Sequence, residues 1–551
     1  MGTATNDSNV RDGPTLWHGS ALVGLAGLAV YGLLCPPASG MGDSSEFTLV
    51  LATHGVAHPT GYPLYTLFGH LFCTLLHGVG TPWPLAAALW SAVGGGLALF
   101  FLHALGTALI DEASPRSPAT RFLAALIPLS LFAFQPIVLG EATRAEVNIW
   151  SLAWACGAAL AFVRLAGAIR GGRAESASRA AGGAAAWGLV VGAGLAHHLT
   201  SVLISIPLTA GLVAMLALRR RLWPRLPLAV GGALVPLASY GIIAWRAWHP
   251  ARVQWAWLVP SLAGVVTHIT GGQYRSFFGS FAPSASQREL LATAAYPFLF
   301  PGLALLVLGL LRAGDRDRRI TWSALTAAAG SVTAFIFQYG VPDPAPYLLP
   351  ALALGVAAAV PAIASVPGAG SRSGAFVLAA ASLASGFVIA PWLRGGWEER
   401  TATIAFEKVI RSMWSAIPPD TAIVSWTDDR FDRLVEYQLL RGEKPALLIV
   451  TPDLLFAPAM RRTIRERFGV DPVEGFRPPR LPYRAPEEER KIIGESRQRL
   501  VRALNERVRV PVILFDPTVP IVWQMRKPWE PAEPPGPRSV PARPRPAHAP
   551  R

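Results

Sequence analysis

The chain has 551 residues, 52% of them hydrophobic and only 15% charged, and a formal net charge of +15. Soluble domains carry about 25% charged residues, so this composition favours a membrane protein. In a soluble protein such a positive charge would suggest nucleic acid. Here most arginines lie in short stretches between apolar segments, so no nucleic-acid partner is expected. Three scattered cysteines predict neither a disulfide framework nor a zinc site.

Eleven apolar segments are predicted to cross the membrane as helices, since about 20 apolar residues span its roughly 30 Å core. The first is interpreted as a retained span rather than a cleaved signal peptide. Arginines lie on both sides of 184–218, so this segment is expected to enter and return, with its turn at 197–200. The predicted spans are 16–36, 84–110, 120–139, 147–169, 184–196, 199–218, 226–245, 290–311, 320–339, 347–365 and 375–394.

The arginines predict the orientation. The loops on the N-terminal side of the membrane hold 15 arginines, and the opposite loops up to residue 394 hold five. Because basic loops stay inside, the N-terminus is expected in the cytoplasm. The odd number of spans then places everything after residue 394 outside. Membrane lipids are the expected surroundings, and the Ala-, Arg- and Pro-rich composition favours a bacterial inner membrane.

Three domains are expected. Residues 1–394 form a mainly α, polytopic membrane helix bundle. Residues 395–527 form a small extracytoplasmic α/β domain, because helical patterns at 401–416, 430–440 and 487–507 alternate with short apolar runs. These runs, at 422–426, 446–450 and 510–515, predict a few parallel strands. The Pro- and Arg-rich tail, 528–551, is expected to be disordered.

The first outer loop, 37–83, has no Lys or Arg and carries the motifs GDSSEF and HGVAHPTGYPL. If a helix starts at Ser44, the carboxylates of Asp43 and Glu46 face the same way. Asp43 could cap that helix, with Glu46 completing a capping box. Alternatively, a carboxylate held at the membrane interface is a natural general base. Prolines stiffen the turn that follows, and the apolar stretch 64–76 is expected to lie along the membrane surface.

This loop resembles the opening motif of the protein O-mannosyltransferase-like family, through GDSSEF and HGVAHPTGYPLYTLFG. The resemblance continues in order through AEV (145–147), GLAHHLT (194–200), HITGGQY (268–274) and VPDPAPYLLP (341–350). Two positions depart from the family pattern. Ser45 stands where Gly is usual, and Asn148 stands where Tyr is usual, which is expected to change a donor or acceptor contact.

The resemblance implies a GT-C type glycosyltransferase. Such an enzyme moves a sugar, here expected to be mannose, from a polyprenyl-phosphate donor to a protein or glycan acceptor on the outer side. It implies that a first-loop carboxylate deprotonates the acceptor hydroxyl, which attacks the anomeric carbon with inversion. By motif position the base is Asp43, with Glu46 as the second candidate. The candidates for binding the donor phosphate or the substrate are Arg144, Glu146, His197, His198, Arg246, His268, Gln273, Tyr274 and Arg275, with His58, Pro59 and Tyr62 completing the first-loop motif.

Several candidates also have structural interpretations. Arg144 lies between Glu141 and Glu146, which fits an ion pair. The two neighbouring histidines could bond backbone carbonyls, and Asp343, between prolines, fits a turn. Tryptophans 245, 248, 255 and 257 fit membrane-interface anchors as well as sugar-stacking surfaces.

No metal site is predicted, because the sequence has no HExxH, paired-Cys or His-x-His pattern. No cofactor is indicated, and a divalent-cation requirement stays open. Glycine-rich phosphate loops are missing too, which argues against a soluble nucleotide-sugar donor. Two other classes remain open: a transporter or lipid flippase, and a non-catalytic membrane assembly protein. The span centres are nearly free of ionisable residues and show no internal repeat, which disfavours transport.

Overall fold

The computed structural model divides the chain into two units, residues 1–408 and 409–551. The predicted helix 487–507 and nearly all of the predicted tail lie outside the described residues. The structure describes residues 14–40, 42–110, 117–171, 177–218, 225–279, 281, 283–366, 368–369, 371–417, 422–425, 428–450, 457–469, 471, 512–515, 522–526 and 530–531.

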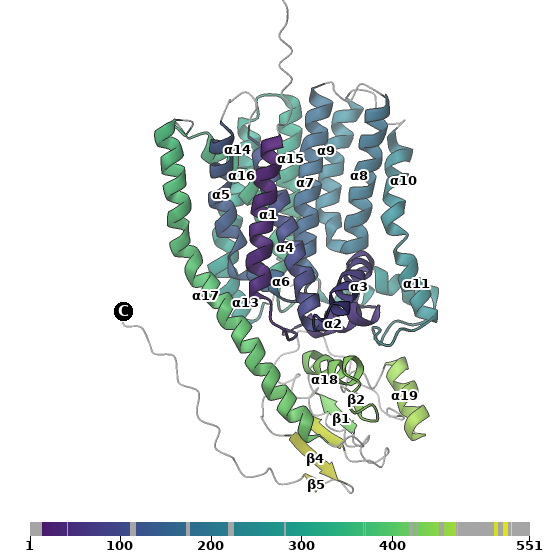
Figure 1. Ribbon diagram of the computed structural model, residues 1–551. Helices are drawn as coiled ribbons and strands as arrows, with labels where there is room; N and C mark the ends of the chain where they lie inside the picture. The colour runs from purple at the N-terminus through teal and green to yellow at the C-terminus, as the bar shows by residue number, and fades with distance from the viewer. Residues whose placement is uncertain are drawn as a thin grey trace, which may run out of the picture. The chain divides into compact units, whose positions relative to one another are not determined.

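The first unit is a bundle of helices that run roughly side by side (Figure 1). Its α-helices, with α17 continuing into the second unit, are α1 (Pro14–Leu34), α2 (Ser44–Thr53), α3 (Pro63–Gly78), α4 (Trp83–Ala108), α5 (Pro118–Ala133), α6 (Pro136–Thr143), α7 (Asn148–Arg170), α8 (Ala177–His197), α9 (Val202–Ala217), α10 (Leu226–Leu237), α11 (Tyr240–Trp248), α12 (Leu262–Ile269), α13 (Ala285–Leu290), α14 (Tyr296–Arg312), α15 (Arg316–Ile336), α16 (Leu349–Ala364) and α17 (Arg372–Ala416). Short 3-10 or π turns are η2 (Leu199–Ser201), η4 (Gly272–Phe277), η5 (Leu291–Ala295) and η6 (Pro346–Leu348).

Each of the eleven predicted spans coincides with helical structure, but their number is not confirmed. Among the described residues, eight helices are long and apolar enough to cross a membrane, and the bent pair α5–α6 makes nine. The two remaining predictions correspond to the shorter apolar helix Ala181–His197 and to α15. Both pack within the bundle, α8 against α10 and α15 against α9, α14 and α16. The chain is therefore an integral membrane protein with a polytopic helix bundle.

Two predicted spans differ in shape from the expectation. The segment 120–139 was expected to be one span, but α5 and α6 meet at an angle of 72°. Pro136, at the first position of α6, cannot continue the hydrogen bonding of the preceding helix. The expected break at 197–200 is confirmed, because α8 ends at His197 and the η2 turn precedes α9.

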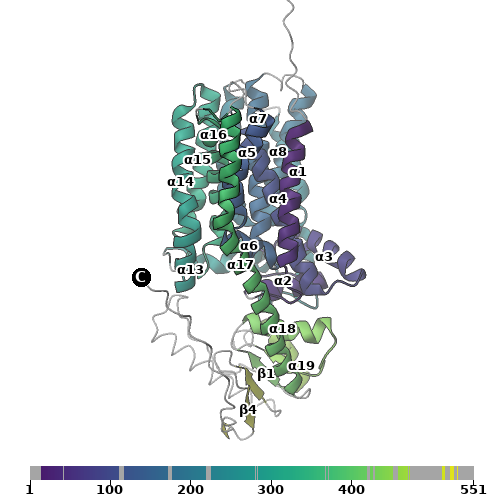
Figure 2. The same cartoon turned by 60° about the vertical axis from the view of Figure 1, so that its left-hand side comes forward.

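Glycines let the spans approach closely. A Cβ atom on Gly24 of α1 would lie 2.9 Å from the carbonyl oxygen of Gly96 of α4. Gly302 of α14 and Gly355 of α16 meet in the same way, and Figure 2 shows these two helices beside α15. In α10, a Cβ on Gly232 would collide with the backbone carbonyl of Ala185 in α8. Lipid is as apolar as the helix surfaces, so this close packing and interhelical hydrogen bonds hold the bundle together.

Helices α2 and α3 lie at the end of the bundle away from the start of α1 (Figure 1). Helix α2 ends at Thr53, the backbone of the following His54 is left-handed (φ 50°), and α3 follows after the HPTGYP turn. Helix α3 has 16 residues and is not among the candidate spans. The α2–α3 connection thus brings the first-loop motif back toward the start of α2.

The second unit contains a five-stranded sheet in the order β2-β1-β3-β4-β5. Strands β1 (Ala422–Ser425), β2 (Leu448–Val450) and β3 (Val512–Phe515) are parallel, with Ala422 opposite Leu448 and Val512. They coincide with the three predicted apolar runs. Strands β4 (Val522–Arg526) and β5 (Glu530–Pro531) add antiparallel pairs that were not predicted, and β5 falls within the expected tail. Helices α18 (Asp428–Leu440) and α19 (Pro458–Phe468) complete the described part.

Helix α17 is continuous across two segments that the sequence analysis treated as separate helices. The predicted span 375–394 and the predicted helix 401–416 form one helix of 45 residues. The two units divide at residue 408, within this helix, whereas the composition placed the boundary at 394.

Two adjacent glycines of α10 provide a matched test of the packing. A Cβ on Gly232 would collide with the α8 backbone, whereas a Cβ on Gly231 would meet nothing within 4 Å. We expect Gly232→Val to destabilise the protein by about 1–3 kcal/mol, as overpacking does, and to lower its thermal midpoint in detergent. Gly231→Val removes the same helix-weakening glycine and should leave the midpoint nearly unchanged. Equal effects of the two variants would contradict the close contact.

Candidate functional site

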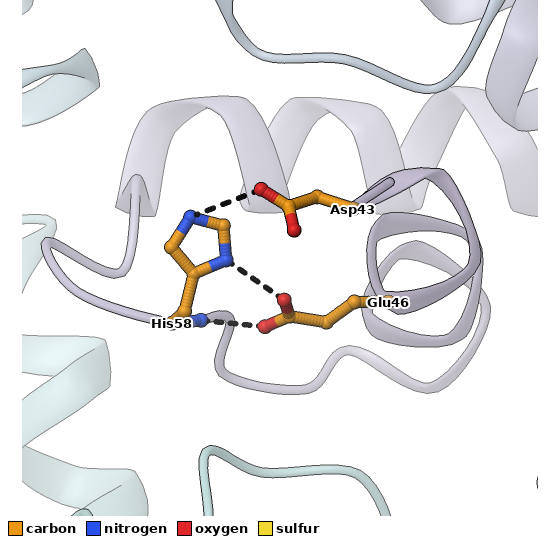
Figure 3. A group of neighbouring side chains, drawn as sticks. All are labelled: Asp43, Glu46 and His58. Carbon is orange, nitrogen blue, oxygen red and sulfur yellow. Dashed lines mark hydrogen bonds and ion pairs between the residues drawn. The ribbon is translucent and has the colours of Figure 1, made fainter. Parts of the chain in front are cut away.

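The first-loop motif folds into a cluster of Asp43, Glu46 and His58 (Figure 3). Asp43 directly precedes α2, Glu46 lies in its first turn, and His58 lies in the connection to α3. The His58 ring lies between the two carboxylates. Its Nδ1 is 2.8 Å from Oε2 of Glu46, and its Nε2 is 3.7 Å from Oδ2 of Asp43. The expectation that both carboxylates face the same way is therefore confirmed.

The capping interpretation of these carboxylates is wrong. Asp43 occupies the N-cap position of α2, but its side chain makes no capping hydrogen bond. Glu46 does not complete a capping box either. Its Oε1 accepts a hydrogen bond from the backbone N–H of His58 at 2.6 Å. Its Oε2 lies 2.8 Å from Nδ1 of the His58 ring. Glu46 therefore ties the returning loop to the first turn of α2.

The two carboxylates differ in their access to solvent. The side chain of Asp43 is 58% exposed, whereas that of Glu46 is 15% exposed. An incoming hydroxyl group can reach Asp43 directly. Glu46 is occupied by His58 and is mostly covered by protein, so the geometry suits it to holding the loop.

His58 is positively charged in this environment. Burial alone would lower the pKa of His58, but the charges of Glu46 and Asp43 outweigh it and raise the pKa to about 9. A doubly protonated ring also fits its partners. Nδ1–H donates to Glu46, and Nε2–H donates to the Tyr62 hydroxyl at 2.9 Å, which in turn donates to the carbonyl of Pro59. This positive charge stabilises the carboxylate form of the neighbouring Asp43.

Arg144 and Glu146 lie beside the start of this loop. A Cβ atom on Gly40 would lie 3.0 Å from Cγ of Arg144, and one on Gly42 would lie 3.9 Å from Oε1 of Glu146. The backbone of Glu146 is held at both N–H and C=O by the hydroxyl of Ser91 in α4. Sequence segments about 100 residues apart thus meet next to Asp43.

Arg144 pairs differently from the expected ion pair. Its Nη1 lies 3.8 Å from Oε1 of Glu399, and its Nε donates to the carbonyl of Gly140. Among the described residues, neither Glu141 nor Glu146 makes an ion pair with it. Their charges still act at longer range: burial opposes the charged form, but Glu146 and Glu141 outweigh it and raise the pKa of Arg144. Burial, and then the charge of Glu141, raise the pKa of Glu146 well above its ordinary value.

The unusual Asn148 has a defined partner. Its amide donates to Oε2 of Glu141 at 3.1 Å. The expectation that this departure changes a donor or acceptor contact stays untested, but the residue does contact a carboxylate next to the Arg144 segment.

Both neighbouring histidines contact backbone, but only His197 contacts a backbone carbonyl, as their structural interpretation expected. His197 lies 3.3 Å from the carbonyl of Val147. His198 accepts from the N–H of Thr200 and so caps the η2 turn. The His198 ring nevertheless faces the first loop, since its centroid is 5.3 Å from that of Tyr62.

His268 and its neighbours reach the same loop from another segment. His268 is buried, and a Cβ atom on Gly61 would lie 3.1 Å from its Nε2. Gly61 has φ +81°, so both its backbone and this contact require glycine. Burial, and then the charge of His58, lower the pKa of His268 to about 4, which leaves it neutral. Tyr274 stacks on Phe277, Arg275 is exposed, and the side chain of Gln273 is outside the described part.

Arg246 belongs to a different group of side chains. Its Nη2 lies 3.3 Å from Nδ1 of His54, and the His54 ring stacks on that of His70 at 4.8 Å. The two histidines were not among the sequence candidates. Their spacing along the chain carried no signal, because the contact depends on α3 folding back against the end of α2.

Trp255 differs from the other three outer tryptophans. Trp245, Trp248 and Trp257 are each more than 40% exposed, as interface anchors are. The ring of Trp255 instead lies 6.2 Å from the His58 ring, centroid to centroid, and the backbone N–H of Trp255 donates to the carbonyl of Val56. Backbone hydrogen bonds thereby join residues 253–255 to the first loop at Val56.

Asp343 adds a further carboxylate near the cluster. Its side chain is exposed, yet partial desolvation by the surrounding protein, and then the charge of Asp43, raise the pKa of Asp343 to about 6. The turn interpretation did not include this electrostatic coupling.

The Asp43, Glu46 and His58 cluster also has the composition of a metal site. One ligand atom from each lies within 4.8 Å of the others. Two carboxylates and an imidazole are ligands that several divalent ions accept. The third ligand, His58, is distant in sequence from the other two, which explains why no pattern indicated it. The prediction of no metal stays a prediction.

Comparisons with known proteins support the family expected from the motifs. Residues 43–221 match the family model described as the N-terminal domain of the protein O-mannosyl-transferase TMEM260. The resemblance of the first-loop motif to O-mannosyltransferase-like proteins is thereby confirmed. No curated protein matches the chain.

Two solved structures are similar to the chain. The chain is similar to ArnT from Cupriavidus metallidurans bound to undecaprenyl phosphate, with 13% identity over 80% of this chain and 90% of that chain and a TM-score of 0.50. It is also similar to the oligosaccharyltransferase AglB from Archaeoglobus fulgidus in complex with an inhibitory peptide and a dolichol-phosphate, with 12% identity and a TM-score of 0.47. That match covers 75% of this chain and 63% of AglB, so this chain spans less than two thirds of it. The likeness to ArnT shows a GT-C type fold.

The charged state of His58 predicts a pH dependence of stability. The pKa is about 9 in the folded chain, above the 6.5 of a free histidine. The folded state therefore holds the extra proton, and this contribution is complete below pH 6.5, declines above it and is lost beyond about pH 9. The thermal midpoint should fall from pH 6.5 to 9.5 more steeply in the wild type than in His58→Gln. His18→Gln, which changes an exposed histidine, should keep the wild-type slope, and parallel curves for all three would contradict the charged His58.

Proposed function

We propose that this chain, with its GT-C type fold and its O-mannosyl-transferase-like segment 43–221, is an integral membrane glycosyltransferase. It moves a sugar, expected to be mannose, from a polyprenyl-phosphate donor to a hydroxyl group of a protein or glycan acceptor. The reaction takes place at the end of the bundle that carries Asp43, which the arginine distribution predicts to be extracytoplasmic.

The observation that carries the proposal is the asymmetry of the two first-loop carboxylates. Asp43 is exposed, makes no capping bond and lies 3.7 Å from a charged imidazole. Glu46 is covered and holds His58 in place. An accessible carboxylate kept ionised by a fixed neighbour is what a general base requires.

In the proposed reaction, Asp43 accepts the proton of the acceptor hydroxyl as its oxygen attacks the anomeric carbon. The bond between this carbon and the phosphate oxygen breaks at the same time, and its electron pair leaves with the polyprenyl phosphate. A single displacement of this kind inverts the anomeric configuration. Glu46 and His58 act by positioning Asp43 and stabilising its charge.

The leaving phosphate needs positive charge near Asp43, and Arg144 offers it. The aliphatic part of its side chain packs on Gly40, three residues before Asp43, and its guanidinium is only weakly paired with Glu399 at 3.8 Å. A guanidinium fork matches phosphate oxygens and keeps its charge at any working pH. Arg246 lies in the separate group with His54 and His70, so we assign it a lesser role. The undecaprenyl phosphate bound by ArnT supports a lipid donor of the same class.

Asp43→Asn tests the base directly. We expect this variant to lose about 10²–10⁴-fold in sugar transfer, the range that a positioned base contributes. The assay uses purified protein with a small panel of polyprenyl-phosphate sugars and a hydroxyl-bearing acceptor. Glu289→Gln, which alters an exposed carboxylate of α13 outside the cluster, should retain activity.

Membrane insertion and thermal stability of Asp43→Asn are measured alongside, and should match those of the wild type. Full transfer activity of Asp43→Asn would refute the mechanism. No transfer by the wild type with any donor in the panel would favour the transporter or assembly alternatives.

Arg144→Gln tests the phosphate contact. Removing a charge-assisted hydrogen bond costs about 1.5–3 kcal/mol, so kcat/KM for the lipid donor should fall roughly 10–100-fold. Arg394→Gln, which alters an exposed arginine of α17 that is not among the candidates, serves as the matched control. If the acceptor KM changes while the donor kinetics stay constant, Arg144 does not bind the phosphate.

A further inference from the structure

A cavity lies at the other end of the bundle from Asp43. It has a volume of about 690 Å³ and is lined by Trp17 and Ser20, near the start of α1. Asp43 follows the opposite end of the same helix (Figure 1). The cavity is therefore separate from the candidate glycosyl-transfer site, by the length of a membrane span.

Five arginines from four helices line this cavity. They come from the start of α5, the end of α7, the end of α14 and the start of α15: Arg121, Arg164, Arg170, Arg312 and Arg318. Among the described residues, no aspartate or glutamate lines it. Positive charge thus converges on one cavity from segments about 200 residues apart in sequence.

Two of the arginines have identified partners. Arg318 forms an ion pair with Asp315, whose Oδ2 is 3.2 Å from its Nε. Arg164 is held over the Trp17 ring at 4.2 Å, a contact that orients a guanidinium without neutralising it. The cavity wall therefore retains an excess of positive charge.

The rest of the wall is largely apolar. Leu305 and Leu308 of α14, Val163 of α7 and Pro361 of α16 line it together with the arginines. The positive-inside rule explains why arginines gather at this end of the bundle. It does not require them to surround one cavity that also offers hydrocarbon contacts, a combination that suits a ligand with a charged head and an apolar body.

We propose that this cavity binds the phosphate headgroup of an anionic membrane phospholipid. Arginine forks hold phosphate oxygens in pairs, and basic pockets between spans on the cytoplasmic side take up such headgroups. The acyl chains extend along the leucine-lined wall of α14. This site is independent of the glycosyltransferase function proposed above.

The test uses the full-length protein in nanodiscs of phosphatidylglycerol and phosphatidylcholine. After mild detergent release, native mass spectrometry measures how much of each lipid stays bound. The wild type should retain phosphatidylglycerol in preference to phosphatidylcholine by at least about tenfold, equivalent to about 1.4 kcal/mol. The variant R121Q/R164Q/R312Q should lose this preference.

Arg372→Gln is the matched control, since Arg372 is an exposed arginine at the same end of the bundle that does not line the cavity. It should keep the wild-type preference. The single variant Arg312→Gln, at an exposed position, guards against misfolding of the triple variant and should reduce the preference partly while retaining the wild-type thermal midpoint.

Inorganic phosphate at 10 mM distinguishes the two possible sources of phosphate. It should leave the retained phosphatidylglycerol unchanged. An equal preference in the wild type and the triple variant would overturn the proposal, as would loss of the preference in Arg372→Gln alone. Displacement of the lipid by inorganic phosphate would identify a soluble anion as the ligand and overturn the lipid assignment.

Discussion

The geometry of the candidate active site depends on the contact between Glu46 and His58. Glu46 holds both the backbone N–H and the ring of His58, and so closes the chain between the start of α2 and the turn before α3. Charge balance makes this contact favourable, because two carboxylates one helical turn apart repel each other unless a cation lies between them. Tyr62 and Trp255 pack around the ring of His58, and His268 lies against the same turn at Gly61. Without this contact, His58 would not be held beside Asp43, and the position of Asp43 would not be fixed.

Hydropathy and arginine counting predict the membrane bundle well, because both depend on the solvent rather than on tertiary contacts. The break after His197 also follows from this logic, since arginines before and after the segment force it to return. The bend between α5 and α6 and the continuation of α17 past residue 394 were not predicted. A helix can bend or continue at the membrane surface with little change in composition, so those boundaries depend on packing that the local pattern does not contain.

The candidate site shows the same limit at the level of single residues. Topology placed nine candidates for donor or substrate binding on one side, but it does not determine which of them share a space. The structure brings Arg144, Glu146 and His268 to the first loop and leaves Arg246 with His54 and His70. The capping interpretation of Asp43 and Glu46 failed for a related reason, since helix-start statistics omit a partner 12 residues along the chain. His58 was named only as part of the first-loop motif, with no role of its own, because its role depends on the return of the chain to the start of α2.

The gathering of arginines at one end also makes the bundle an oriented charge in an electric field. An energised membrane is negative inside, and moving one elementary charge across 100 mV changes the free energy by about 2.3 kcal/mol. If the bundle were inverted, each arginine that lines the cavity, Arg121 and Arg312 among them, would have to move its charge against this voltage. In the orientation that the arginine count predicts, the voltage adds to the insertion signal that these residues carry in the sequence, and it keeps Asp43 on the positive side of the membrane. Loss of the membrane potential would remove this part of the preference for one orientation without altering any contact within the protein.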